Sequence, residues 1–210
     1  VMGLLNEDKP LIQTRPFREV HHTATRAALI GGGGIPRPGE ISLAHGGVLF
    51  LDELPEFRKS VLEVLRQPLE ERKIQISRTH GNYAFPAGFM LVAAMNPCPC
   101  GYYPDMEKCT CTPAQIQKYL SRISHPFLDR IDLCVEASRI RYDDLTENHS
   151  GESSAVIRER VCRAREIQKE RYKETDIKIN AMLKSDDLKR FCVLGKEENE
   201  LMERAYSVMG

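Results

Sequence analysis

The sequence predicts an α/β domain built on a parallel sheet, followed by a small helical domain. Two continuous apolar runs, at 48–51 and 89–95, are typical of strands covered on both faces. Beyond about residue 150 the chain becomes highly charged, almost free of proline and helical in its apolar spacing. We therefore expect an α/β domain over 1–150 and an all-helical domain over 151–210.

Turn residues and apolar spacing predict the other elements. The Pro- and Gly-rich residues 1–47 predict loops and short strands around one helix near Thr23–Leu29. The later spacing predicts, in chain order, a helix at Arg58–Arg72, a hairpin of Lys73–Arg78 with Tyr83–Phe85, a helix at Pro113–Ile123, a strand at Arg130–Glu136, and helices from Ser153, at Leu188–Val193 and at Glu197–Met209. Three cysteines fall on predicted core faces, where we expect them buried: Cys134, Cys162 and Cys192.

Composition excludes several classes of protein. The chain has 210 residues with 30 Lys+Arg and 30 Asp+Glu, which excludes a uniformly basic nucleic-acid binder but allows locally basic loops. No run reaches about 18 apolar residues, so we expect no membrane span. The N-terminus lacks a signal-peptide layout and the number of cysteines, 7, is odd. Both features favour a reducing, cytoplasmic location over a disulfide framework.

Two carboxylates, Asp52 and Glu53, directly follow the apolar run 48–51. Ligands of open α/β sheets bind at the carboxyl edge of the strands, where this pair is expected. One carboxylate there can hold Mg²⁺ while the next orients an attacking water, as in phosphoryl transfer. A solvated acidic loop after a core strand fits the same two residues, because such strings are common.

Two more polar residues fall at matching places. Asn96 follows the run 89–95, where its amide can position a water or a terminal phosphate, although Asn is also a common turn former. Arg130 precedes a predicted strand and can donate bidentate hydrogen bonds to phosphate; a surface ion pair with Asp129 or Asp132 is the alternative. Each of these polar groups lies at one end of a predicted strand: first the acidic pair, then the asparagine, then the arginine. This arrangement along the chain favours a nucleotide site.

Three strings resemble motifs of AAA+ ATPases. GEISLAHGGVLFLDELPEF resembles the Walker B region, VAAMNPCPCG the sensor 1 strand and LSRISHPFLDRIDL the arginine-finger segment. Together with RPFREVHHT and the Cys-rich stretch after Asn96, they are closest to the ComM-like (YifB) group of the magnesium-chelatase-like family. The resemblance covers essentially the whole chain. It implies an AAA+ type P-loop NTPase core with inserted hairpins, followed by a helical lid.

The resemblance also implies roles for single residues. Asp52 would bind the Mg²⁺ of MgATP, and Glu53 would be the general base. Asn96 would be sensor 1, in contact with the γ-phosphate and the water. Arg130 would be the arginine finger that reaches the nucleotide of a neighbouring subunit, which implies a homo-oligomeric, hexameric ring.

DNA is the partner that the resemblance implies, through a helicase or branch-migration role in competence. Two segments would face DNA or the pore of the ring. They are an insertion at Arg15–Leu29, with Arg18, His21 and His22, and the hairpin Lys73–Phe85, with Arg78 and His80. Basic loops of this kind can contact phosphates, but ordinary solvated loops fit the same residues.

The 210 residues contain no G-x-x-x-x-G-K-[ST] motif, so the phosphate-cradling Walker A loop is missing from them. Gly31–Gly34 cannot replace it, because Pro36 and Pro38 lack N–H donors and block a helix that points at the loop. We interpret the chain as a fragment of a longer ATPase. We expect these residues alone neither to bind ATP tightly nor to hydrolyse it.

Four cysteines form two close pairs, Cys98-x-Cys100 and Cys109-x-Cys111. Four thiolates from two short loops can enclose a tetrahedral Zn²⁺, although C-x₂-C is the more usual spacing. Reduced thiols in a surface loop fit the same pattern.

Two other functions stay open. A magnesium-chelatase motor subunit would use the same core to drive metal insertion into a porphyrin, and a zinc-stabilised interaction module would need no catalysis. The residues around the acidic pair favour the ComM-like group over the first. A Walker A segment upstream would separate a motor from an interaction module.

Overall fold

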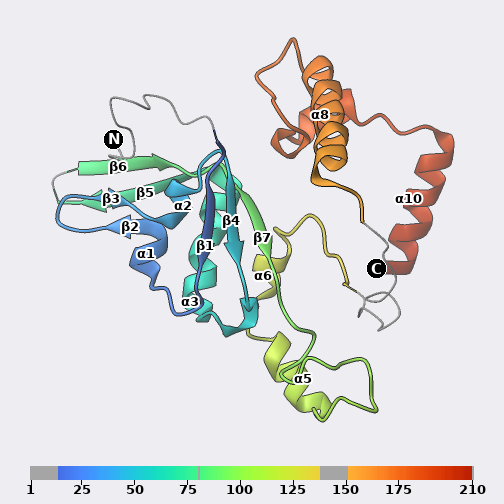
Figure 1. The fold of residues 1–210 in the computed structure, drawn as a ribbon. Helices are drawn as coiled ribbons and strands as arrows, with labels where there is room; N and C mark the ends of the chain where they lie inside the picture. Colours follow the sequence, from blue (N-terminus) through green and yellow to red (C-terminus); the bar gives the residue numbers. More distant parts are fainter. Residues whose placement is uncertain (1–13, 80, 138–150, 210) are drawn as a thin grey trace. The chain divides into compact units, whose positions relative to one another are not determined.

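The computed structural model describes residues 14–79, 81–137 and 151–209 (Figure 1). The chain divides into two compact units, Val1–Glu136 and Ala137–Gly210. Each unit is described by itself below.

A three-stranded sheet in the order β1-β4-β7 forms the centre of the first unit (Figure 1). Its strands are β1 (Phe17–Val20), β4 (Val48–Leu51) and β7 (Met90–Ala93). Both pairings are parallel, and Leu51 is the partner of Val20 on one side and of Ala93 on the other. All three strands therefore end at the same edge. The strands predicted from the two apolar runs are confirmed, the second one in shortened form.

Among the described residues, the central strand β4 is buried on one face only. Leu49 and Leu51 are 0% exposed. Val48 and Phe50, on the other face, are only half-buried, and their neighbour Met90 is 60% exposed. The prediction that both faces of 48–51 are covered is therefore wrong for this part of the chain, because the helices pack against the Leu49 face alone.

Short helices and two hairpins surround the sheet. The helices are α1 (Arg26–Ile30), α2 (Glu40–Leu43), α3 (Lys59–Leu62), α4 (Arg66–Glu71), α5 (Pro113–Leu120) and α6 (His125–Leu128), with 3₁₀ turns η1 (Leu54–Glu56) and η2 (Glu63–Leu65). The hairpins pair β2 (Gly31–Gly32) with β3 (Arg37–Pro38), and β5 (Lys73–Arg78) with β6 (Gly81–Pro86). The predicted helix Arg58–Arg72 is a succession of α3, η2 and α4. Pro68 lies in the first turn of α4, where its missing N–H costs no intrahelical hydrogen bond.

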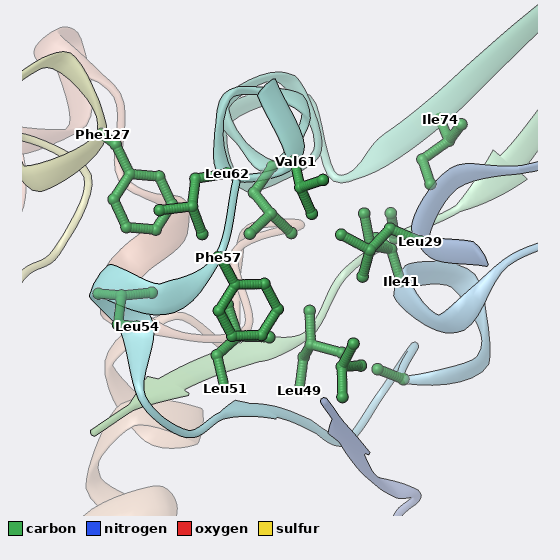
Figure 2. Packing of buried hydrophobic residues seen from close by; sticks show 14 of the residues in the cluster. Leu29, Ile41, Leu49, Leu51, Leu54, Phe57, Val61, Leu62, Ile74 and Phe127 are labelled. Carbon is green, nitrogen blue, oxygen red and sulfur yellow. The ribbon is translucent and has the colours of Figure 1, made fainter. Parts of the chain in front are cut away.

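Apolar side chains from the covered face and from the helices form one core (Figure 2). Leu29 of α1, Ile41 of α2 and Leu62 of α3 meet Leu49 of β4 in this cluster, each at most 2% exposed. Phe127 of α6 is 0% exposed and belongs to the same cluster. The core thus anchors both the central strand and the segment that carries Arg130.

Two predictions differ from the structure. Residues 131–137 form no strand; Leu133 is 84% and Val135 is 90% exposed. The alternating pattern there suits a strand, but no described strand pairs with it. The three cysteines expected in the core are exposed: Cys134 lies in this irregular segment, and Cys162 and Cys192 lie in the second unit.

The second unit is helical, with α8 (Ser154–Arg171), η3 (Asn180–Met182), α9 (Ser185–Phe191) and α10 (Lys196–Met209). Ser153 caps α8 by accepting a hydrogen bond from the Val156 N–H. Tyr172 is 2% exposed and meets the ring of Phe191 edge-on, with 5.1 Å between centroids. Among the described residues, no helix combines the length and the apolar character needed to cross a membrane.

A close backbone approach at Gly47 starts the pairing of β1 with β4. The Val48 N–H donates to the Pro16 carbonyl at 2.8 Å, and a Cβ at Gly47 would lie 1.9 Å from that oxygen. We expect Gly47→Ala to lower the free energy of unfolding by about 1–3 kcal/mol or more, measured by urea denaturation. Gly34→Ala is the matched control: nothing lies within 4 Å of its Cβ position, so its effect should stay within about 0.5 kcal/mol. Equal effects of the two variants would contradict this account.

Candidate active site at the carboxyl edge of the sheet

Asp52 and Glu53 form an exposed turn at the end of β4. Glu53 has left-handed backbone angles, φ 53° and ψ 47°, and its N–H donates to Asp52 Oδ1 at 2.8 Å. A residue with a side chain costs about 1–2 kcal/mol in this conformation. Leu51 and Leu54, on either side of the turn, are buried in the core and hold both ends of the turn in place. The core therefore imposes the conformation that presents two neighbouring carboxylates to solvent.

His22, two residues beyond β1, contacts the acidic turn. Its Nδ1 lies 3.0 Å from Glu53 Oε2, and its ring meets the Phe57 ring edge-on. The ring of His21 lies 4.1 Å from that of His22. Sequence reasoning assigned both histidines to a DNA-facing or pore-facing loop and did not expect them beside Glu53. The signal that could have found this contact is the short stretch FREV, read as a strand parallel to VLFL.

The segment beyond β7 is hydrogen-bonded to both sides of the acidic turn. The Ala94 N–H donates to the Leu51 carbonyl at 2.9 Å, and the Leu54 N–H donates to the Ala94 carbonyl at 3.0 Å. Asn96, which is exposed, follows two residues later. The structure thus brings the ends of β1, β4 and β7 together with their polar residues.

Arg130 and Arg122 are both paired within the chain. The Arg130 guanidinium forms an ion pair with Glu70 of α4 and donates to the Pro126 carbonyl. Arg122 pairs with Glu56 at 2.8 Å and donates to the Pro55 carbonyl at 3.3 Å. Arg122 therefore contacts the turn η1, which begins immediately after Glu53, whereas Arg130 is held by a different helix.

Among the described residues expected to face DNA, Arg18 and His22 pair with carboxylates of the same chain. Arg18 lies in β1, not in a loop, and donates to both carboxylate oxygens of Glu40 at 2.6 and 2.8 Å. This hydrogen bonding raises the pKa of Arg18. The expectation that 15–29 is an insertion is wrong, because residues 17–20 are a strand of the main sheet. Arg78 ends β5 and donates to the Ser77 carbonyl at 3.0 Å, and His80 lies outside the described residues.

Four cysteines, Cys98, Cys100, Cys109 and Cys111, converge beyond Asn96. Their sulfur atoms all lie within 4.8 Å of one another, Cys98 is buried, and the group can hold a metal ion. Hydrogen bonding from the Tyr102 backbone N–H lowers the pKa of Cys100 to about 6. Burial raises the pKa of Cys111 to about 12.

The fold and the candidate site define a class of protein: an α/β domain with candidate ligand-binding groups at the carboxyl edge of a parallel sheet. The family model described as magnesium chelatase, subunit ChlI, matches residues 1–145. The model for the C-terminal part of that subunit matches residues 151–210. The chain belongs to the magnesium-chelatase-like family of AAA+ ATPases.

Three curated proteins are similar to this chain over most of its length. Competence protein ComM of Haemophilus influenzae is 51% identical to this chain over 93% of the chain's residues. YifB of Escherichia coli is 47% identical over 97% of the chain, and Rv2897c of Mycobacterium tuberculosis is 44% identical over 90% of it. The chain spans 38–40% of the length of these relatives. Among solved structures, NtrX from Brucella abortus in complex with ADP has 17% identity, covers 56% of this chain and 24% of its own, and has a TM-score of 0.39, too low to carry an argument.

The left-handed conformation of Glu53 gives a test of the turn. Glycine adopts this conformation freely, whereas a β-branched residue is strained in it. We expect Glu53→Gly to leave the free energy of unfolding unchanged or to raise it by up to about 1 kcal/mol. Glu53→Val should lower it, and urea denaturation of the two variants measures the difference. A valine variant as stable as the glycine variant would contradict the observed backbone.

Proposed function

We propose that the protein is an ATPase that couples ATP hydrolysis to the remodelling of DNA. One observation carries the proposal: the acidic turn Asp52–Glu53 follows the central strand, and its flanking residues Leu51 and Leu54 are hydrogen-bonded to Ala94, two residues before Asn96. Family membership supports ATP as the nucleotide. The relative from Haemophilus influenzae is named a competence protein, which supports DNA as the partner.

Each polar group at the edge has a role in this proposal. Asp52 offers carboxylate oxygens, the ligands that Mg²⁺ prefers, and would hold the Mg²⁺ of MgATP. Glu53 would orient the attacking water and accept its proton. Asn96 would donate to the terminal phosphate and position the water. His22, 3.0 Å from Glu53, would fix the direction of that carboxylate.

The assembly in the proposal is a homo-hexameric ring in the cytoplasm. Arg130 would leave Glu70 and reach the nucleotide of the neighbouring subunit as an arginine finger. Arg78, at the end of the β5–β6 hairpin, would contact DNA phosphates. Because the 210 residues contain no Walker A motif, they would not hydrolyse ATP by themselves. A magnesium-chelatase motor, which the family description names, is the alternative.

Removal of one carboxylate tests the catalytic assignment. In the complete protein, Glu53→Gln should reduce DNA-stimulated ATPase turnover roughly 10²–10⁴-fold and leave MgATP binding by calorimetry unchanged, because only proton acceptance is lost. Glu71→Gln, at an exposed carboxylate at the end of α4 and outside the site, is the control and should keep most of the turnover. Normal turnover of Glu53→Gln would overturn the assignment. An ATPase that responds to a porphyrin-chelatase partner and not to DNA would favour the alternative.

A mixing experiment tests the finger. Arg130→Ala should lower turnover roughly 10³-fold or more in the assembled ring. Rings that mix Arg130→Ala subunits with Glu53→Gln subunits should regain part of the activity, because an intact Glu53 then meets an intact Arg130 from its neighbour. If the mixed rings regained no ATPase activity, Arg130 would act on the nucleotide of its own subunit. Normal turnover of Arg130→Ala would make Arg122 the next candidate.

A further inference from the structure

We propose that Cys98, Cys100, Cys109 and Cys111 bind one structural Zn²⁺ ion that joins the loop after β7 to the start of α5. Nucleotide hydrolysis at the sheet edge needs no ligand from these cysteines. The zinc assignment can therefore be tested, and can fail, independently of the proposed ATPase activity.

The distances between the sulfur atoms match a single tetrahedral ion. A Zn–S bond of about 2.3 Å in tetrahedral geometry places neighbouring sulfurs about 3.8 Å apart. The distance is 3.3 Å between Cys98 and Cys100, 3.6 Å between Cys100 and Cys109, and 3.8 Å between Cys98 and Cys109. No pair among the four exceeds 4.8 Å. An iron–sulfur cluster, with several irons between its thiolates, would need a wider arrangement.

The first cysteine pair lies on a tight turn that fixes its sulfurs. Cys98 is 0% exposed, and the Tyr103 N–H donates to its sulfur at 3.4 Å. Gly101, with φ 78°, donates its N–H to the Cys98 carbonyl at 3.0 Å and closes the turn. Backbone N–H groups that point at ligand atoms are the usual outer support of a metal site.

The second pair leads directly into helix α5. Cys111 precedes Thr112, which caps α5 in a reciprocal capping box with Gln115. At the other end of the helix, Tyr119 is 7% exposed. Arg122, just beyond it, pairs with Glu56. An ion between the two cysteine pairs therefore fixes the helix at its start, and the Arg122–Glu56 pair fixes it at its end.

The same ion would also fix the segment that carries Asn96. Asn96 is two residues before Cys98, and its Cγ lies 4.0 Å from the position that a Cβ would take at Gly101. The turn of the first pair therefore folds back toward Asn96. Because a structural metal site contributes directly to folding, loss of the ion should loosen both segments together.

Metal analysis of the complete protein, purified without added metal, tests the site. We expect about one zinc per chain by mass spectrometry, all of it released by a mercurial titrant that blocks thiols. Replacement by Co²⁺ should give sulfur-to-cobalt charge-transfer bands and the strong visible bands of a tetrahedral centre. Less than about 0.2 zinc per chain, iron in its place, or disulfides among the four cysteines would overturn the proposal.

Cysteine variants and hydrogen exchange test whether the zinc ion clamps the loop after β7 to the start of α5, or binds there without a structural effect. Cys100→Ser and Cys111→Ser, at partly exposed positions, should lose most of the zinc. Cys162→Ser, at an exposed cysteine outside the cluster, should keep it. Chelation should speed amide exchange in 97–101 and 109–120, with the β5–β6 hairpin unchanged as the internal reference. Full zinc in Cys100→Ser and Cys111→Ser, or no change of exchange after chelation, would contradict the clamp.

Discussion

The parallel register of three short strands is the constraint on which the candidate site depends. Leu51 is paired with Val20 on one side and with Ala93 on the other, so three segments far apart in sequence end at one edge. Whatever follows these strands must lie there: the histidines after β1, the acidic pair after β4 and the asparagine after β7. A slip of one residue would also turn Leu49 and Leu51 out of the core. The burial of these leucines therefore selects the geometry of the polar groups.

The buried residues on either side of the acidic turn fix its backbone conformation. Leu51 and Leu54 are buried, which leaves only two residues to reverse the chain between them. The chain accepts a left-handed Glu53 at that place, although glycine would fit with less strain. The hydrogen bonds of Leu51 and Leu54 with Ala94 hold the turn against β7. A strained residue with an ionisable side chain is typical of a site kept for chemistry and not for stability.

Sequence patterns predicted those parts of the fold that are local. Continuous apolar residues mark β4 at 48–51 and β7, which covers 90–93 of the run 89–95, and the hairpin 73–86 alternates as strands do. β1 could not be assigned in the same way, because FREV is short and half charged and gains its place only from pairing with β4. The segment 131–137 has the alternating pattern, but no strand in the described part of the chain pairs with it. Cysteine spacing predicted that four thiols could meet, whereas the contact of His22 with Glu53 follows only from the parallel register of FREV beside VLFL.

The two arginines near the site, Arg122 and Arg130, differ in the intrachain contacts that each would break if its side chain moved toward a nucleotide. Arg122 pairs with Glu56, on the turn that begins after Glu53, and also lies over the ring of Tyr119 at 5.9 Å. Its departure would release α5 and disturb the turn that presents the acidic pair. Arg130 pairs with Glu70 in α4, so an exchange of that carboxylate for a phosphate would leave the turn intact. In the proposed ring, Arg122 would therefore be a positioning residue in its own subunit. Arg130 would be the side chain that acts on a neighbouring subunit.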